Sequence, residues 1–226
     1  MQRARLAQKR RPGLGEVSAL CFYATKLRFR DLAFDIGANH GGHTAQMLAR
    51  GARVVAVEPQ ADLAADLSRR FPSATVVSQA VSDHAGEAEL HIARDLDAVA
   101  SLDEGWVTAC AVSFTWERTE KVAVTSLDAL IAEHGEPKLI KIDTEGLDHR
   151  VLLGLSRPVA HILFEINPGP SARVAFERLD ELGAYEYRAA PQIGSESWMF
   201  GKPLKPDEIV NDLEMMCNVY ARRLDS

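Results

Sequence analysis

Four acidic residues of the 226-residue sequence each stand at or near the end of a short apolar run. Such runs are typical of strands buried inside a parallel sheet. The carboxyl ends of parallel strands open at one edge of the sheet, where ligands bind, so we expect the four side chains to converge there. Carboxylates at that edge can accept hydrogen bonds from ligand hydroxyls, take up a proton or bind a metal ion. The four residues are Asp35, Glu58, Asp143 and Glu165.

A glycine-rich turn follows the first acid, and a helical pattern opens at Thr44. Strand, glycine turn and helix in this order form a nucleotide-binding corner. Asn39 occupies the second glycine position of the G-x-G-x-x-G pattern, which the pyrophosphate of NAD needs for its close approach. S-adenosylmethionine has no phosphate and carries positive charge, which suits Asp35. The turn therefore favours S-adenosylmethionine over NAD, although the acid and the glycines could also form a tight turn without a ligand.

The second acid lies about twenty residues beyond the turn, where a carboxylate can accept hydrogen bonds from ribose hydroxyls. The glycines suit a turn with positive φ or a ligand close to the backbone. From these positions we predict that the cofactor is bound by Asp35, Gly37, Asn39, Gly41, Thr44 and Glu58.

Five segments in order along the chain resemble the successive motifs of the FkbM methyltransferases: 34–41, 57–59, 80–83, 125–128 and 140–146. The resemblance covers roughly residues 31–167. It implies a transferase with small-molecule acceptors, commonly hydroxyls of sugars or natural products, and it implies that Gln79 and Ala80 line the adenine of the cofactor. One position departs from the family, because members commonly have Glu where this chain has Asp148.

Methyl transfer to an aliphatic hydroxyl requires a positioned acceptor and removal of its proton. Asp143, at the end of its strand, is expected to face the acceptor, and Glu145 follows two residues later. His149, in the first turn of the next helix, has the best-matched intrinsic pKa for a base. We predict Asp143, Glu145 and His149 as the catalytic residues, with His40 and His43 beside the cofactor turn as alternative bases.

A metal ion could assist the same step. Asp143, Glu165 and Asn167 offer oxygen donors of the kind that Mg²⁺ prefers, and a bound Mg²⁺ keeps waters that substrate hydroxyls can displace. The alternative is that these three side chains hydrogen-bond the acceptor without a metal. The residues leave the two readings open.

The elements that must position these residues fit an α/β fold, a doubly wound Rossmann-like and mostly parallel sheet of the class I methyltransferase type. We expect a basic flexible tail over 1–13 and a single methyltransferase domain over 14–226. Residues 84–124 contain two alternating runs, 87–92 and 120–124, that predict an inserted β-hairpin region. The spacing of apolar residues predicts an amphipathic helix over about 207–224. Further strands are expected at 53–58, 75–77, 138–143, 159–166, 185–188 and 197–200.

The net charge of −6 argues against a nucleic-acid substrate, although basic residues gather before position 31. The three scattered cysteines fit free thiols in a reducing cytoplasm. No apolar run is long enough for a membrane span. The abundance of Ala and Arg is typical of high-GC bacterial proteins. Aromatic residues of the insert, such as Trp106 and Trp116, suit either a sugar surface or a homodimer interface.

These observations together predict a cytoplasmic, S-adenosylmethionine-dependent O-methyltransferase. Its acceptor is expected to be a hydroxyl of a small molecule, a sugar or oligosaccharide, and neither nucleic acid nor a membrane is expected as a partner. Two alternatives remain at this stage: a catalytically silent cofactor-binding module and an NAD-dependent oxidoreductase.

Overall fold

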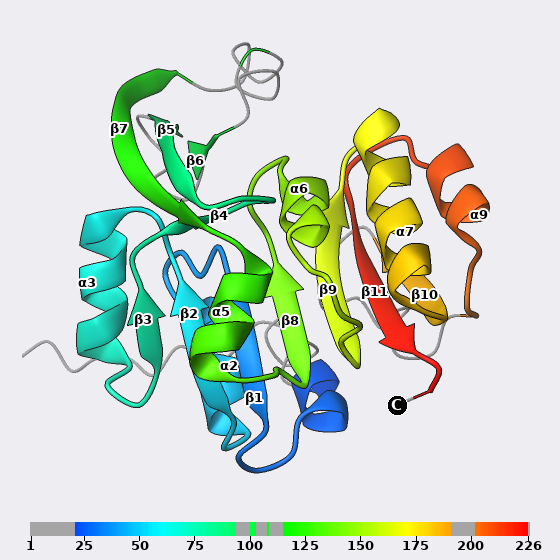
Figure 1. Cartoon of the computed structure of the whole chain (residues 1–226), viewed down its shortest axis with the longest axis horizontal. Coiled ribbons are helices and arrows are strands. Elements are labelled where there is room, and N and C mark those ends of the chain that lie inside the picture. The colour runs from blue at the N-terminus through cyan, green and yellow to red at the C-terminus, as the bar shows by residue number, and fades with distance from the viewer. Residues whose placement is uncertain (1–20, 94–99, 103–107, 109–114, 191–201, 226) are drawn as a thin grey trace, which may run out of the picture.

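The computed structural model describes residues 21–93, 100–102, 108, 115–190 and 202–225. A seven-stranded sheet in the order β10-β11-β9-β8-β1-β2-β3 forms its centre (Figure 1). The five strands from β9 to β3 are parallel, whereas β11 runs antiparallel to both of its neighbours. The strands are β1 Leu32–Ile36, β2 Arg53–Val57, β3 Thr75–Val77, β8 Leu139–Ile142, β9 His161–Ile166, β10 Tyr185–Ala190 and β11 Cys217–Arg223.

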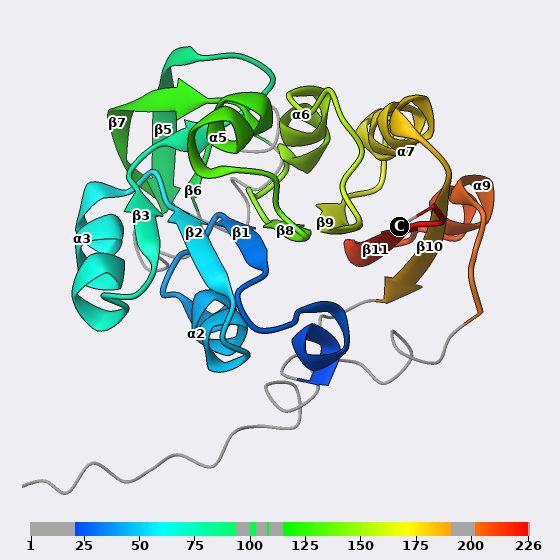
Figure 2. The same cartoon turned by 60° about the horizontal axis from the view of Figure 1, so that its bottom comes forward.

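Helices cover both faces of this sheet (Figure 2). Successive side chains of a strand point to opposite faces, so β1 sends Phe34 and Ile36 into one core and Ala33 into another. The first core packs against α5 Leu127–His134, α6 Asp148–Leu153, α7 Pro170–Leu182 and α9 Pro206–Asn211. The opposite face is covered by α2 Gly42–Ala49, α3 Ala61–Arg70 and the helical residues 21–26. The doubly wound fold predicted from the sequence is therefore confirmed.

A second sheet of four strands, in the order β4-β7-β5-β6, lies beyond the carboxyl ends of β2 and β3 (Figure 1). Its long strands β5 Gly86–Ala93 and β7 Trp116–Thr125 pair antiparallel, and its short ones are β4 Ala80–Val81 and β6 Ala100–Ser101. It has its own small core, which includes Leu90, Ile92 and Val124. The insert predicted from the sequence is thus a small sheet, and it lies beyond the carboxyl edge of the central sheet.

The predicted helix over 207–224 is wrong. Within the described part of this region only α9 is helical, and β11 follows it as a strand. β11 lies between β9 and β10, so both of its backbone edges form ladder hydrogen bonds that a helix in this place would leave unmade. Its side chains alternate as a strand requires, with Val219 and Ala221 in one core and Tyr220 in the other. The apolar spacing that suggested a helix therefore belongs to two different elements.

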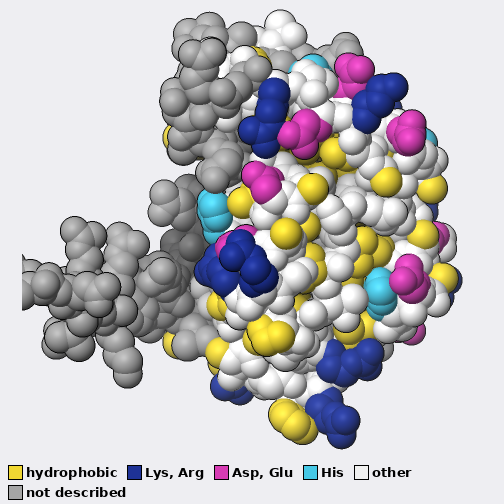
Figure 3. Space-filling model, turned by 90° about the vertical axis from the view of Figure 1, so that its left-hand side faces the viewer, with side chains coloured by type: hydrophobic (Ala, Val, Ile, Leu, Met, Phe, Trp, Pro, Cys, Tyr) yellow, Lys and Arg dark blue, Asp and Glu magenta, His cyan; other side chains and the backbone are white. Residues whose placement is uncertain are grey.

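Two other predicted segments, the tail at 1–13 and the strand at 197–200, lie outside the described residues. Among the residues that are described, no helix is both long and apolar enough to cross a membrane. Side chains of both charge signs are mixed over the face that Figure 3 shows. On α3, the exposed Arg69 and Arg70 both pair with Asp66.

Candidate functional site

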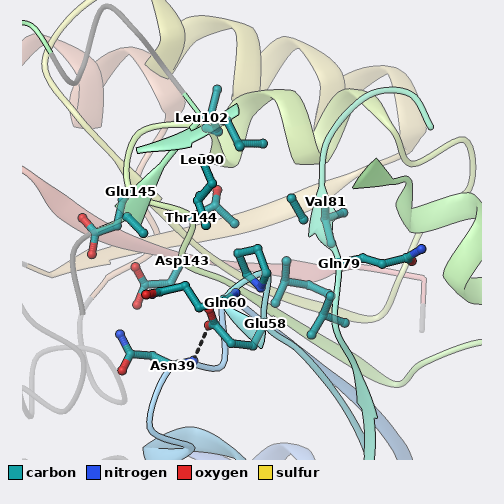
Figure 4. Close-up of a pocket in the computed structure, with 17 residues that line it drawn as sticks. Asn39, Glu58, Gln60, Gln79, Val81, Leu90, Leu102, Asp143, Thr144 and Glu145 are labelled. Atoms are coloured by element: carbon teal, nitrogen blue, oxygen red, sulfur yellow. Dashed lines mark hydrogen bonds between the residues drawn. The ribbon is translucent and has the colours of Figure 1, made fainter. Parts of the chain in front are cut away.

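A cavity lies between the carboxyl edge of the central sheet and the second sheet (Figure 4). It contains about 620 Å³ of empty space, including space open to solvent. Its polar wall comes from the glycine turn and from the ends of β2 and β8, and its apolar wall comes from the second sheet. The residues used below are Gly37, Asn39, Glu58, Gln60, Gln79, Ala80, Leu90, Ala100, Leu102, Asp143, Thr144 and Glu145.

The glycine turn is held against β2 by two backbone hydrogen bonds. The N–H groups of Gly37 and Ala38 both donate to the carbonyl of Val57 at 3.0 Å. Gly37 has φ 69°, and a Cβ added there would lie 1.8 Å from the carbonyl oxygen of Asp143. Only glycine fits such a position. The turn can therefore run directly beside the end of β8, which brings the segments that follow β1 and β8 together.

Glu58 is the best-anchored acid in the cavity. Its side chain is 4% exposed, and it accepts hydrogen bonds from the backbone N–H of Asn39 at 2.8 Å and of Gln60 at 3.0 Å. Burial raises the pKa of the Glu58 carboxyl, and the two N–H donors oppose that rise. A carboxylate oxygen can accept more than one hydrogen bond, so this residue keeps acceptor capacity toward the cavity. That geometry suits a pair of ribose hydroxyls.

Asp35, predicted to bind the cofactor, does not line the cavity. It is fully buried beneath the turn, where it accepts from the hydroxyl of Thr44 at 2.6 Å and faces the ammonium of Lys141 at 3.4 Å. Thr44 and Gly41 also lie outside the cavity lining. The structure thus separates the predicted cofactor residues into two groups. Around the cavity lie Gly37, Asn39, Glu58, Gln79 and Ala80, whereas Asp35, Gly41 and Thr44 support the turn from behind.

Asp148 connects the end of β8 to β9. Its buried carboxylate accepts from the backbone N–H and the hydroxyl of Thr144, at 2.8 and 2.7 Å, and from the backbone N–H of Glu165 at 2.7 Å. The aspartate where family members commonly have Glu is therefore long enough to make three hydrogen bonds. It fixes the loop that carries Glu145.

Four carboxyl groups, those of Asp143, Glu145, Asp148 and Glu165, gather around this loop, and the pKa values of the last three are raised. Burial, with Asp143 and Asp148 nearby, raises the pKa of Glu145 to about 7. Burial and Asp143 raise the pKa of Asp148 to about 6, against the effect of its hydrogen bonds. Burial and the three other acids raise the pKa of Glu165 to about 9. Burial and the crowding of like charges therefore explain why all three pKa values are raised.

Of the predicted bases, only Glu145 lines the cavity. Its backbone has φ 50°, and its carbonyl accepts from the hydroxyl of Ser101 at 2.8 Å, a buried residue of the second sheet. His149 lies in α6, outside the cavity lining. His40 is exposed, and the ring of His43 is hydrogen-bonded to the hydroxyl of Tyr23 at 2.8 Å. The structure therefore separates Glu145 from the three histidines.

The predicted magnesium ligands do not fit a metal site well. Asp143 lines the cavity, but its carboxylate already faces the ammonium of Lys141 at 3.4 Å. Glu165 and Asn167 lie outside the lining, and the raised pKa of Glu165 favours its protonated form at neutral pH. Within the described part of the chain, no group of three or more His, Cys, Asp or Glu side chains is arranged to hold a metal ion.

Three residues that contact the segments forming the cavity were not singled out from the sequence. Lys141 is buried within an apolar strand, and a lysine inside such a run is the signal that could have drawn attention to it. Gln60 donates its backbone N–H to Glu58, and Ser101 holds the carbonyl of Glu145 from a distant segment. Neither of these two has a sequence signal, because each contact depends on the tertiary arrangement.

One family model matches this chain, and several solved structures are similar to it. The family described as "Methyltransferase FkbM domain" matches residues 35–189. No curated protein matches the sequence. Among solved structures, a TehB-like S-adenosylmethionine-dependent methyltransferase from Corynebacterium glutamicum is similar over 92% of this chain and 87% of that one, with 13% identity and a TM-score of 0.50.

Two further structures have lower scores. A precorrin-6y C5,15-methyltransferase from Geobacter metallireducens is similar over 97% of this chain and 92% of that one, with 12% identity and a TM-score of 0.48. An rRNA methylase from Streptococcus thermophilus is similar over 96% of this chain and 99% of that one, with 12% identity and a TM-score of 0.49. The family match covers more than half of the chain and agrees with the motifs, the fold and the cavity. The chain belongs to the FkbM family of S-adenosylmethionine-dependent methyltransferases.

Proposed function

We propose that the protein transfers the methyl group of S-adenosylmethionine to a hydroxyl of a small, polyhydroxylated acceptor, a sugar or oligosaccharide. The observation that carries this proposal is that one cavity contains both Glu58, anchored to accept from ribose hydroxyls, and Glu145, an acid with a raised pKa. The first residue serves the cofactor and the second serves the acceptor.

Glu145 is proposed as the general base. A base works best when its pKa lies near the working pH, and burial beside Asp143 and Asp148 raises the pKa of Glu145 to about 7. In the transfer step, the acceptor oxygen forms a bond to the methyl carbon while the carbon–sulfur bond breaks. The hydroxyl proton moves to the Glu145 carboxylate, and S-adenosylhomocysteine leaves. Asp143, which lines the same cavity, is proposed to orient the acceptor by accepting a hydrogen bond.

The apolar wall is proposed to hold the adenine. Leu90, Ala100 and Leu102 come from the second sheet and line the cavity together with Gln79 and Ala80. A flat base between apolar side chains buries surface without requiring charge. The sugar acceptor itself is supported by the acid-rich edge, because carboxylates accept hydrogen bonds from several hydroxyls, and by the family resemblance.

The first experiment is calorimetry. We expect wild-type protein to bind S-adenosylhomocysteine, and we expect NAD not to compete. The second is a panel of mono- and oligosaccharides incubated with a labelled methyl donor, with and without a chelator. Turnover that survives chelation supports the metal-free mechanism, whereas turnover that is lost and then restored by Mg²⁺ would return Asp143 and Glu165 to the role of metal ligands.

Two variants identify the base. Glu145→Gln should lower the turnover rate by roughly a hundredfold or more while leaving the affinity for S-adenosylhomocysteine within a few fold. His149→Ala, on the neighbouring helix, is the matched control and should retain most of the activity. The opposite pattern would assign the base to His149. Cofactor binding without turnover on any acceptor would favour a catalytically silent binding module.

A further inference from the structure

Lys141 occupies a place in the fold where a charged side chain is costly. It lies on β8, whose four residues are all buried, and its side chain is 2% exposed. In the sheet register it is the direct neighbour of Asp35 on β1, so both side chains point to the same face of the sheet. Burying an ammonium group costs several kcal/mol unless it is paired and hydrogen-bonded. Its polar contacts must therefore offset that cost.

Those contacts belong to two segments that meet behind the cavity. The Lys141 ammonium donates to the carbonyl oxygen of Gly37 at 2.9 Å and to that of Ile36 at 3.4 Å. It also lies 3.4 Å from a carboxylate oxygen of Asp35 and 3.4 Å from one of Asp143. Ile36, Gly37 and Asp143 line the cavity, whereas Lys141 and Asp35 do not.

These four groups around the ammonium all carry negative charge or the negative end of a dipole. Without a cation between them, the two carboxylates and the two carbonyls would repel one another in a poorly solvated space. A single cation attracts all four and thereby fixes the position of the Gly37 carbonyl relative to the Asp143 carboxylate. An apolar side chain could fill the same volume but could not attract these four groups and hold them in place.

We propose that Lys141 is a positioning residue for the cofactor, which holds the glycine turn and Asp143 in their binding arrangement before the ligand arrives. The inference rests on the proposed cofactor site. Lys141 acts through Gly37 and Asp143 and does not itself touch the ligand. Pre-organisation of this kind increases affinity because the site need not be ordered upon binding.

The test uses pairs of variants, since Lys141→Met alone would leave Asp35 as an unpaired buried charge and could prevent folding. Asp35→Asn removes that charge, and an amide can still hydrogen-bond with the hydroxyl of Thr44. We compare Asp35→Asn with the double variant Asp35→Asn/Lys141→Met by calorimetry with S-adenosylhomocysteine and by thermal unfolding. Lys138→Met is the matched control, because Lys138 is exposed just before the start of the same strand.

We expect the double variant to unfold within a few degrees of Asp35→Asn but to bind S-adenosylhomocysteine at least tenfold more weakly. We also expect faster hydrogen exchange at the amides of Gly37 and Ala38, which are bonded to Val57 in the native turn. Lys138→Met should bind as the wild type does. Equal affinity and equal exchange in the single and the double variant would overturn the inference. Absence of binding in the wild type would instead count against the proposed function.

Discussion

Replacing Glu58 by Gln tests the cofactor site most directly. The substitution preserves the shape of the side chain but removes its charge and one of its two acceptor oxygens. Both oxygens are in use, one toward the N–H of Asn39 at 2.8 Å and the other toward that of Gln60 at 3.0 Å. The new amide NH₂ must face one of these donors. One backbone N–H therefore loses its partner in a nearly dry position, which costs about 1–3 kcal/mol of folding free energy.

Glu58→Gln should also weaken binding of the ligand. A hydrogen bond from a ribose hydroxyl to a charged acceptor contributes about 1.5–3 kcal/mol. Loss of one such bond corresponds to a rise in the Kd for S-adenosylhomocysteine of roughly ten- to a hundredfold. Because the two penalties act on different equilibria, the unfolding free energy and the ligand affinity should both fall.

Calorimetry measures the affinity and denaturant titration measures the unfolding free energy. Glu133→Gln is the matched control, since that side chain is 75% exposed on α5 and removal of its charge should change neither quantity. A Kd for Glu58→Gln within twofold of the wild-type value would refute the assignment of Glu58 to the ribose.

Two further predictions concern the acids around the end of β8. Asp148→Ala removes the acceptor of three hydrogen bonds and leaves the backbone N–H groups of Thr144 and Glu165 without this partner. The unfolding free energy measured by denaturant titration should therefore fall by about 2–4 kcal/mol. Undiminished stability would contradict the role given to Asp148. The pKa of Glu165 is raised from 4.5 to about 9, so between these pH values the folded state holds a proton that the unfolded state releases. The resulting stabilisation is fully present below about pH 4.5 and is lost as the pH rises through about 9. Glu165→Gln should therefore flatten the decline of the melting temperature between about pH 5 and 9, and an unchanged slope would show that Glu165 ionises normally.

The local signals in the sequence were enough to predict the parallel part of the sheet and the glycine turn. Each parallel strand of the central sheet is a short apolar run bounded by polar or turn-forming residues. The glycine turn depends on glycines that lie close together in the chain. The C-terminal region was mispredicted because Ile209 belongs to a helix and Tyr220 to a strand, and their spacing imitates a single helix. Only pairing with β9 and β10 decides that residues 217–223 are extended.

The sequence predicted the edge of the sheet at which the cavity lies, but it did not predict the direction of each side chain. Asp35 stands at a strand end, as Glu58 and Asp143 do, yet the register of β1 with β8 places it beside Lys141 and under the turn. The position of a buried cation on a strand far away in the chain cannot be read from local sequence. For the same reason, the sequence could not show that Glu145 lines the cavity and that His149 does not.

The second sheet has a thermodynamic consequence. Its small core is separate from the cores of the central sheet, and it contributes Leu90, Ala100 and Leu102 to the walls of the cavity. A cofactor bound there contacts both sheets at once, so its binding free energy is linked to the local opening of each. Saturating ligand should suppress the opening of β5 and β6 as strongly as that of the glycine turn. A methyl donor bound in this cavity would therefore link two separately packed units, and the apolar wall proposed to hold its adenine would be stabilised by the ligand that it binds.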